Sequence, residues 1–351
     1  MIDLFLKGYY KNANFYRNLI RFNLKNTFES IILTKIQLLW RLNNHIIMDS
    51  IIVATGINKS YSSHKALENV NISIPKKSIY GLLGPNGAGK TTFIRLLTQI
   101  TRPDSGTILF NDRPINVNDT LNMGYLPEER GLYKKMEVGE QAIYLAQLKG
   151  LSRPEAIKRL KYWFEKFEIA SWWRKKVEEL SKGMQQKIQF IVTIIHGPQL
   201  VILDEPFSGF DPINAELIKE ELIRLNNSGS TIILSTHRME SVEELCTDIA
   251  LINKSKVLLS GPIKEIIRTH RDNNYAFNYK GASNPSLFSK YDIISHSIGI
   301  DCNTAVIKLN DSTLNTTLLE IIPMIELVSV NEIKPTMNEI FVKTVKNDTH
   351  A

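Results

Sequence analysis

From residue 50 onward, short runs of β-branched and aliphatic residues alternate with turn-forming residues. Runs of this kind at 51–55, 71–74 and 78–83 predict three strands, and Pro-Lys-Lys at 75–77 predicts the turn between the last two. The third run leads directly into a glycine-rich loop, and residues 93–97 after that loop have apolar positions at helical spacing. The pattern therefore predicts a strand, a loop and a helix near the start of an α/β domain.

The middle of the chain is predicted to be a helical insert over about residues 137–198. Ser152 and Glu155 have the spacing of a capping box, which predicts a helix over 156–167. The large apolar side chains of this helix share one face: Leu160, Trp163, Phe164 and Phe167. A second, strongly apolar helix is expected over 188–195.

The sequence changes character again after residue 268. Short alternating runs such as 305–309 predict strands, and a capping box within 335–339 predicts a terminal helix through Val345. About 80 residues suffice for a small α+β domain. We therefore expect three parts: an N-terminal extension, 1–47, an α/β domain, 48–268, and an accessory domain, 269–351.

The 351-residue chain has an ordinary globular composition, with 43% hydrophobic and 23% charged residues. This composition excludes a disordered, collagen-like or disulfide-rich protein. Because no run of about 18 uncharged apolar residues occurs, any membrane role is expected to be peripheral. Cys246 and Cys302 are too isolated for a disulfide framework or a zinc site, and packing roles in a reducing cytosol are expected.

The net charge of +7 is concentrated in residues 1–47, which contain seven basic and two acidic side chains. Three interpretations of this extension are open. The first is a basic amphipathic helix that lies on anionic lipid. The second is a leader, against which the missing cleavage pattern argues. The third is that Met48 is the native first residue. The small surplus of positive charge in the rest of the chain argues against nucleic-acid binding.

The glycine-rich loop at 84–92 reads Gly-Pro-Asn-Gly-Ala-Gly-Lys-Thr-Thr and matches G-x-x-x-x-G-K-[ST] between a predicted strand and a predicted helix. Glycines let consecutive backbone N–H groups face an anion, and the helix N-terminus adds partial positive charge at the same point. A nucleotide phosphate is therefore expected, with Lys90 on the β- and γ-phosphates and Thr91 on Mg²⁺. The other expected contacts are Gly84, Asn86, Gly87, Gly89 and Thr92.

A second group of candidate residues follows two further β-like runs. The run 200–206 contains Asp204 and Glu205, and since side chains alternate along a strand, these carboxylates are expected to have different tasks. Asp204 is the expected partner of Mg²⁺, and Glu205 is placed to orient and polarise an attacking water. His237, after the run 231–236, is expected to bridge the γ-phosphate and Glu205.

Ser181 and Gly183 precede the apolar helix in the segment Leu-Ser-Lys-Gly-Met-Gln-Gln. Ser181 is a good N-cap and Gly183 leaves backbone amides open, so a second phosphate site is expected. With these motifs in order, residues 50–268 resemble the nucleotide-binding subunit of an ATP-binding cassette (ABC) transporter. The resemblance implies a P-loop ATPase core, with a mixed sheet and a helical signature subdomain, followed by the small α+β domain. It also implies that ATP lies between the P-loop of one subunit and the Ser181–Gly183 signature of a second, in a head-to-tail pair.

The resemblance extends to single residues. Tyr61 resembles the aromatic that stacks on adenine, although a packing role at a strand end is also open. Asp211 resembles the loop that couples the two sites, and Glu128 stands where the family usually has a Gln that senses Mg²⁺. A carboxylate there can reach the metal through water. The departures from the family pattern are Glu128, Lys182, Met184 and Phe210.

By the same resemblance, the helical subdomain receives a short helix of a separate membrane permease subunit. Two roles are open for Trp172, Trp173 and the basic residues 174–176. They contact the permease helix or lipid headgroups, or the tryptophans belong to the core and the basic residues to the solvated surface. The C-terminal part is similar to the extension of ATPases from ABC-2-type exporters, including the sodium-export branch. The implied function is ATP hydrolysis that drives export, by a homodimer or heterodimer on the cytoplasmic face of the membrane. The alternative is a non-transport ABC ATPase that acts on ribosomes or nucleic acid.

Overall fold

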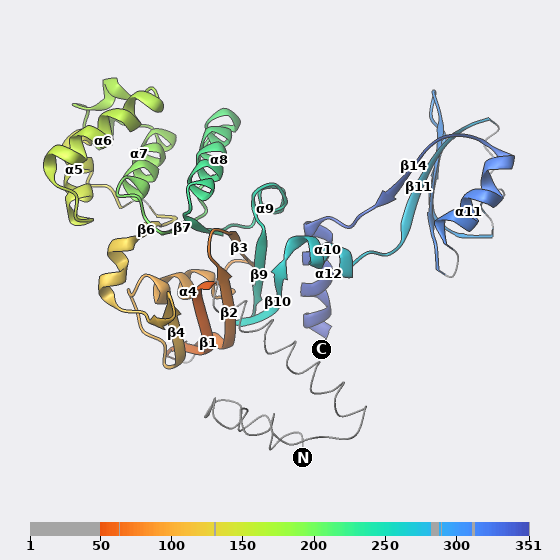
Figure 1. The fold of residues 1–351 in the computed structure, drawn as a ribbon, viewed down its shortest axis with the longest axis horizontal. Helices are drawn as coiled ribbons and strands as arrows, with labels where there is room; N and C mark the ends of the chain where they lie inside the picture. Colours follow the sequence, from red (N-terminus) through yellow and green to blue (C-terminus); the bar gives the residue numbers. More distant parts are fainter. Residues whose placement is uncertain are drawn as a thin grey trace, which may run out of the picture. The chain divides into compact units, whose positions relative to one another are not determined.

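The structure, a computed structural model, describes residues 50–350 apart from 63, 130, 282–287, 289 and 311–312. The N-terminal extension, 1–47, and its three interpretations therefore lie outside the described residues. The described chain contains an antiparallel sheet, a central mixed sheet, a second antiparallel sheet and the helices between them (Figure 1).

The first sheet is antiparallel and has the strand order β2-β1-β4-β5. Its strands are β1 (Ser50–Tyr61), β2 (His64–Pro75), β4 (Ser105–Phe110) and β5 (Arg113–Pro114). Strands β1 and β2 extend far beyond the predicted runs 51–55 and 71–74. Register shifts between Ala54 and Lys59 break the alternation of apolar and polar positions, which is why the pattern underestimates both strands.

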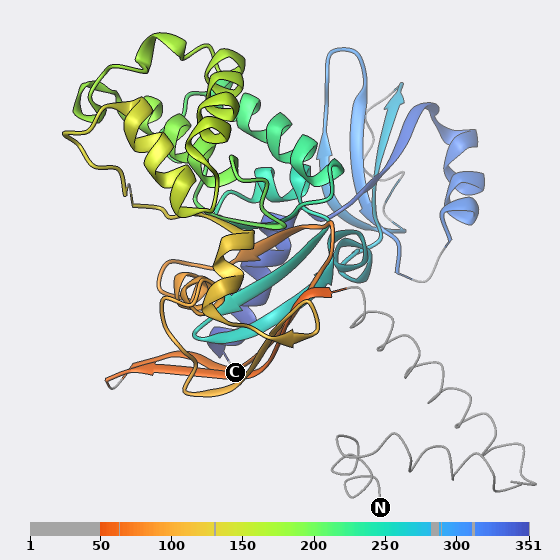
Figure 2. The same cartoon turned by 60° about the vertical axis from the view of Figure 1, so that its left-hand side comes forward.

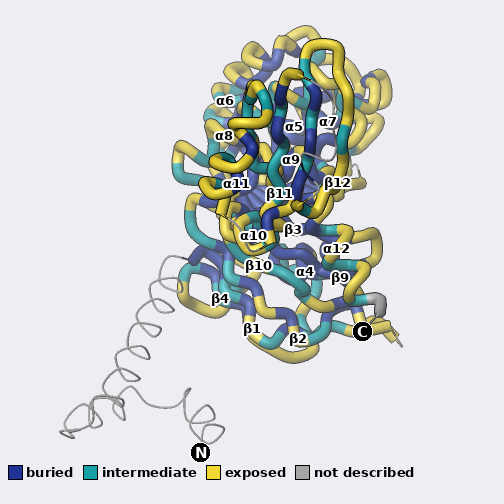
Figure 3. The backbone as a smooth tube through the Cα atoms, turned by 90° about the vertical axis from the view of Figure 1, so that its right-hand side faces the viewer, coloured by how far each residue is buried: buried dark blue, intermediate teal, exposed yellow. Residues whose placement is uncertain are grey.

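The central sheet has the order β10-β9-β3-β8-β7-β6, in which β10 is antiparallel to β9 and all other pairs are parallel. Its strands are β3 (Ile79–Leu83), β6 (Met123–Leu126), β7 (Leu200–Asp204), β8 (Thr231–Ser235), β9 (Asp248–Asn253) and β10 (Lys256–Pro262). Every residue of β3, β7 and β8 is buried (Figure 3). Since parallel strands end at the same edge of a sheet, the loops after β3, β7 and β8 come together there.

Helices flank this sheet and separate its strands along the chain. They are α4 (Lys90–Leu97), α5 (Val138–Leu148), α6 (Arg153–Lys166), α7 (Lys182–Ile194), α8 (Pro212–Asn227), α9 (Met239–Leu245) and α10 (Ile263–Thr269). Short 3-10 helices are η1 (Val117–Asn122), η2 (Ala170–Trp172) and η3 (Val177–Glu179). Helices α5, α6 and α7 gather in one helical segment between β6 and β7 (Figures 1 and 2).

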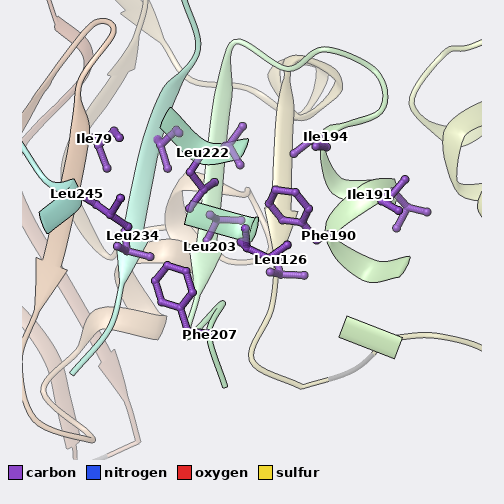
Figure 4. Close-up of a cluster of buried hydrophobic side chains, with 14 of the residues drawn as sticks. Ile79, Leu126, Phe190, Ile191, Ile194, Leu203, Phe207, Leu222, Leu234 and Leu245 are labelled. Carbon is purple, nitrogen blue, oxygen red and sulfur yellow. The ribbon is translucent and has the colours of Figure 1, made fainter. Parts of the chain in front are cut away.

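Helix α7 joins the helical segment to the central sheet. Figure 4 shows Phe190, Ile191 and Ile194 of α7 in the same cluster as Leu126 of β6 and Leu203 of β7. None of these side chains is more than 2% exposed. Burial of each contributes roughly 1.5–3 kcal/mol relative to leaving it in water.

Helix α6 starts at Arg153, three residues before the predicted start, and without the full capping box. Ser152 Oγ accepts the backbone N–H of Glu155 at 3.4 Å, whereas the Glu155 carboxylate accepts a hydrogen bond from Arg159 Nε at 2.7 Å instead of turning back. The predicted apolar face is buried: Leu160, Trp163, Phe164 and Phe167. Trp173 packs against Phe164, with ring centroids 5.2 Å apart, and residues 174–176 are exposed, which is the core-and-solvated-surface arrangement.

A buried imidazole follows α7. His196 Nε2 lies 3.3 Å from the Met123 carbonyl oxygen, and Lys149 Nζ donates a hydrogen bond to the same oxygen at 2.8 Å. Burial, followed by the nearby Lys149 ammonium and then Arg159, lowers the pKa of His196 to about 4, against the opposing effect of the Met123 hydrogen bond. The ring is therefore neutral in the folded protein at neutral pH.

This depressed pKa predicts an acid-sensitive contribution to stability. The unfolded chain binds a proton at His196 near pH 6.5, whereas the folded chain resists it until about pH 4. The contribution is therefore complete above pH 6.5 and is lost as the pH falls through this window. Between pH 7 and pH 4.5, we expect the free energy of unfolding of wild type to fall by about 1–2 kcal/mol relative to that of His196→Gln. This is less than the full pKa shift would give, because the His196 side chain is partly exposed and water solvates its charged form. Urea unfolding at both pH values measures this, with His64→Gln on the surface as the control. Equal pH dependence of wild type and His196→Gln would contradict it.

The third sheet is antiparallel, with the order β12-β13-β11-β14. Its strands are β11 (Asn274–Lys280), β12 (Asp292–Ser297), β13 (Asn303–Lys308) and β14 (Glu326–Ile333), and the helical elements after β13 are α11 (Leu314–Ile321), η5 (Ile322–Met324) and α12 (Met337–His350). This sheet has its own apolar cluster, which includes Phe277, Phe288 and Ile307.

The predicted capping box before α12 is confirmed. Thr336 N donates to Glu339 Oε2 at 2.8 Å, and Glu339 N donates to Thr336 Oγ1 at 3.2 Å. The helix continues beyond the predicted end, Val345, to His350. Its buried side chains belong to the cluster of the central sheet and not to that of the third sheet. The boundaries of the three predicted parts stay a prediction.

Candidate nucleotide-binding and hydrolysis site

The loop between β3 and α4 adopts a conformation that requires glycine at two positions. Gly84 and Gly89 have φ angles of +146° and +119°. A Cβ atom would lie 2.1 Å from the Ile252 carbonyl oxygen at the first position and 2.5 Å from that of Ala66 at the second. Side chains are therefore excluded on these sides, and the loop backbone is free to face an anion at the N-terminus of α4. Asn86 and Gly87 lie exposed at the tip of the loop.

Lys90, the first residue of α4, folds back over this loop. Its Nζ donates hydrogen bonds to the carbonyl oxygens of Gly84 at 2.6 Å and Pro85 at 3.0 Å, and the residue is 8% exposed. Burial lowers the pKa of the Lys90 ammonium, while the carboxylates of Glu205, Asp204 and Glu128 act in the opposite direction. Three acidic groups, at the end of β7, directly after it and in the loop after β6, therefore lie close enough for their charges to act on the cation that is expected to bind phosphate. Thr92, two residues further along α4, is half-buried.

Thr91 and Asp204 form the oxygen pair expected for Mg²⁺. Thr91 Oγ1 donates a hydrogen bond to Asp204 Oδ2 at 3.3 Å, from the start of α4 to the end of β7. Asp204 is 3% exposed. Burial raises the pKa of its carboxyl, the nearby Glu205 adds to this effect, and the Thr91 hydroxyl opposes it. A hydroxyl and a carboxylate are the hard oxygen ligands that Mg²⁺ prefers, so the pair fits the ion.

Glu205 and His237 form a second contact, directly beside the first. The Glu205 Oε1 accepts hydrogen bonds from the backbone N of His237 at 3.0 Å and from its Nδ1 at 2.7 Å. Glu205 is only 12% exposed in its side chain, whereas the His237 ring is 66% exposed. This leaves Nε2 of the ring toward solvent, as the predicted bridge between Glu205 and a γ-phosphate requires.

The structure corrects the reason why Asp204 and Glu205 point in different directions. Strand β7 ends at Asp204, so Glu205 does not belong to the alternating strand pattern. Its φ angle is +50°, in the left-handed region, and its backbone N donates to the Ser235 carbonyl at 2.8 Å. The left-handed turn, and not strand alternation, therefore sets the direction of the Glu205 side chain.

The signature and the coupling loop are neighbours within the chain. Ser181 Oγ accepts a backbone N–H of the first turn of α7 at 3.3 Å, and Asp211 caps α8 in the same way at 2.9 Å. A Cβ atom at Gly183 would lie 3.2 Å from the Gly209 carbonyl oxygen. Among the described residues, no hydrogen bond joins Ser181, Gly183 or Asp211 to the P-loop.

Tyr61 and Glu128 occupy exposed positions. Tyr61 ends β1 and is 41% exposed, with Lys59 Nζ 5.5 Å from its ring centroid. Asp104 accepts hydrogen bonds from Lys59 Nζ and from Ser60 N, both at 2.7 Å, which fixes this strand end. Glu128 is exposed in the loop after β6, close enough for its charge to act on Lys90.

Sequence reasoning missed two residues of the site. Thr236 Oγ1 donates a hydrogen bond to Glu205 Oε2 at 3.2 Å, so both carboxylate oxygens are held. A hydroxyl residue next to His237 at the end of an apolar strand was the available signal. Asp104, which fixes the end of β1, lies 45 positions from Lys59 and gives no local signal.

Comparisons with known proteins place the chain in a family. The family model described as "ABC transporter" matches residues 67–208, which contain the P-loop, the signature and both carboxylates. The chain is 50% identical over 218 residues to an uncharacterized ABC transporter ATP-binding protein, YhaQ, of Bacillus subtilis (strain 168), which covers 62% of this chain and 73% of YhaQ. The chain belongs to the ABC transporter ATP-binding proteins. The predicted resemblance is thereby confirmed.

Two further similarities agree with this membership. The ABC chain is 33% identical over 223 residues to the Nod factor export ATP-binding protein I of Cupriavidus metallidurans, covering 63% of this chain and 74% of the relative. A solved structure described as the ATP-binding subunit of an ABC transporter matches with a TM-score of 0.59 and 27% identity, over 63% of this chain and 93% of that one. The predicted P-loop ABC ATPase fold is confirmed.

A second family model, described as an AAA domain, putative AbiEii toxin, Type IV TA system, matches residues 176–243. In the described part of the chain, the helices are too short or too polar to cross a membrane.

Proposed function

We propose that this ABC chain hydrolyses ATP, with Mg²⁺, as one half of a head-to-tail pair, and that hydrolysis drives a separate membrane permease subunit in the direction of export. The observation that carries the proposal is the convergence of Lys90, Asp204 and Glu205 at one edge of the central sheet. Phosphate binding alone would need only the loop and Lys90. A buried carboxylate and a second, hydrogen-bonded carboxylate beside them favour hydrolysis.

Glu205 is the proposed base for the attacking water. Its Oε1 accepts hydrogen bonds from the backbone N and the Nδ1 of His237, and its Oε2 accepts one from Thr236, which leaves a lone pair on Oε2 for a further hydrogen bond. A carboxylate fixed in this way orients a water and accepts its proton as the bond from the water oxygen to the γ-phosphorus forms and the bond from that phosphorus to the bridging oxygen of ADP breaks. His237 Nε2, on the exposed side of the ring, faces the γ-phosphate.

Thr91 and Asp204 are the proposed holders of Mg²⁺, and Glu128 contacts it through water. When bound, the ion neutralises charge on the β- and γ-phosphate oxygens. Lys90 exchanges its hydrogen bonds with Gly84 and Pro85 for the phosphates. Tyr61 stacks on the adenine, for which its exposed ring is suited.

A second copy, or a related ATP-binding subunit, completes each site. Ser181 and Gly183 lie at the N-terminus of α7, where open amides favour an anion, and among the described residues no hydrogen bond joins them to the P-loop of their own chain. Asp211 and Gly209 lie beside this signature. Pairing therefore supplies the missing side of the phosphate site and places Asp211 between the two sites.

An exposed apolar patch supports a protein partner at the helical segment. Lys149 Nζ, directly after α5, donates a hydrogen bond to the Thr120 carbonyl at 2.7 Å, which brings α5 and η1 together. Large apolar side chains on these two elements are 44% to 63% exposed: Val117, Leu121, Tyr144 and Leu148. We assign this patch to the permease subunit, which holds the chain at the cytoplasmic face of the membrane. The export direction rests on the relative named for Nod factor export and on the C-terminal extension.

The pairing is tested with Ser181→Asn in the full-length chain. Asparagine is as good an N-cap as serine, so α7 is retained, but the hydroxyl at the signature is lost. We expect the ATP turnover number to fall about tenfold, the size of one lost charge-assisted hydrogen bond, with unchanged affinity for ATP at low protein concentration. The mass of the particle with and without Mg-ATP, measured by light scattering, reports the pair. Ser152→Asn, at the N-cap of α6, is the matched control. Turnover that does not depend on Ser181 or on chain concentration would contradict the pair.

A further inference from the structure

Helix α9 begins two residues after His237 and depends on tertiary contacts for its stability. It has seven residues, Met239–Leu245, and its N-cap residue, Arg238, makes no side-chain capping bond. Helices this short are not stable alone in water, because the cost of nucleation is not recovered. The place of α9, and with it the start of the His237 segment, therefore depends on what packs against it.

Helix α12, which follows the third sheet, is one of the elements that pack against α9. Met337 and Ile340 of α12 are each 1% exposed and share a cluster with Met239 and Val242 of α9, which are 8% and 0% exposed. The contact thus buries apolar side chains on both helices. Each fully buried side chain of this size contributes roughly 1.5–3 kcal/mol relative to leaving it in water.

A polar bond fixes the register of the two helices. Glu243 Oε1 of α9 accepts a hydrogen bond from the backbone N of Met337, the first residue of α12. This N–H has no partner within its own helix, and a carboxylate beside a helix N-terminus is also favoured by the helix dipole. The neighbouring Glu244 accepts a hydrogen bond from Lys219 of α8. Adjacent carboxylates of α9 therefore bind two different helices.

The far end of α12 is also attached to the ATPase core. Asp348 Oδ2 accepts a hydrogen bond at 2.8 Å from Nδ2 of Asn253, the last residue of β9. At the near end, only residues 334–336 separate α12 from β14, an edge strand of the third sheet. One of these is Pro335, which restricts the connection. A displacement of the third sheet is therefore passed to the first turn of α12, where Glu243 binds.

We propose that α12, through Glu243, positions His237 for hydrolysis, so that the accessory sheet governs the rate at which the site turns over. His237 has two attachments: its bonds to Glu205 and the chain that leads into α9. When α12 is docked, α9 is fixed and His237 reaches Glu205 with both its backbone N and its Nδ1. When the Glu243 bond is lost, the segment after His237 is freed while the P-loop is untouched. The inference rests on the proposed hydrolytic function and adds the element that controls it.

The test compares Glu243→Ala, Glu243→Gln and Glu240→Ala in the full-length chain. Alanine removes the acceptor for the Met337 N–H, whereas glutamine keeps an oxygen that accepts it. Glu240 lies exposed on the same short helix and serves as the charge-matched control. We expect the kcat of Glu243→Ala to fall about tenfold with KM for ATP within twofold of wild type, since misplacement of a catalytic group by about 1 Å costs up to a hundredfold. Glu243→Gln and Glu240→Ala are expected within twofold of wild type.

Hydrogen exchange distinguishes positioning from general damage. In Glu243→Ala we expect faster amide exchange over 236–246 and over the first turn of α12, with unchanged exchange in α4 and β7. An unchanged kcat in Glu243→Ala, an equal loss in Glu243→Gln, or exchange that rises throughout the core would each overturn the inference. A wild-type chain that hydrolyses no ATP would instead refute the proposed function, which keeps the two failures separate.

Discussion

Replacing Glu205 by glutamine is expected to lower the ATP turnover number by at least about a hundredfold, the size of effect that general-base catalysis supplies. Glutamine keeps the shape of the side chain and one oxygen for the bonds from His237, whereas its amide nitrogen replaces the oxygen that accepts from Thr236 and cannot accept the proton of the attacking water. ATP affinity should be preserved, because Lys90 and the P-loop are unchanged and one negative charge beside the phosphates is removed.

The same variant should accumulate the ATP-bound pair. Light scattering with and without Mg-ATP measures this state, and phosphate release measures turnover. The matched control is Glu216→Gln, which makes the same change from carboxylate to amide at an exposed position of α8 and should behave like wild type. Wild-type turnover in Glu205→Gln would remove Glu205 from the role of base and leave Asp204 as the remaining carboxylate at this sheet edge.

Replacing Glu221 by alanine is expected to destabilise the fold by about 2–3 kcal/mol, because a buried carboxylate between two cations is lost. Glu221 on α8 is 3% exposed and accepts hydrogen bonds from Arg224 Nε at 2.8 and 3.0 Å and from Lys166 Nζ of α6. Both cations also lie over the Trp163 ring, at 5.2 and 5.5 Å from its centroid. Removing the carboxylate leaves two positive charges beside one aromatic ring.

The expected value lies below that of a fully buried pair because the Lys166 and Arg224 side chains are 31% and 49% exposed, so water solvates them after the change. Urea unfolding monitored by Trp fluorescence measures the loss. Glu220→Ala, the exposed neighbour on the same helix, should change the free energy of unfolding by less than about 0.5 kcal/mol. Equal effects of the two substitutions would show that Glu221 does not join α6 to α8.

The sequence was most informative where the chemistry is local. The P-loop residues are contiguous, and the glycines that its turns require are visible in the chain itself. Ser181 was recognisable as an N-cap residue, and it caps α7. The Thr91–Asp204 hydrogen bond joins residues 113 positions apart, yet it was predictable because parallel strands end at one edge of the sheet.

Other features depend on backbone geometry or on distant packing. The left-handed turn at Glu205 contradicts the preference of that residue type, so no propensity rule indicates it. The bulges in β1 disguise a twelve-residue strand as a shorter one. The docking of α12 on α9 depends on tertiary contacts, and an amphipathic helix pattern predicts a buried face without naming its partner.

The docking of α12 also has a consequence for the synthesis of the chain. Glu243 and Met337 are 94 positions apart, and a ribosome that adds 5–20 residues per second needs about 5–19 s to make that segment. Throughout this interval, the side chains of Met239 and Val242 lack the surface that later covers them. The apolar side chains on α9 of the nascent chain are therefore accessible to chaperones until α12 emerges. If the ribosome stalls before α12 is made, these side chains stay without their cover from α12.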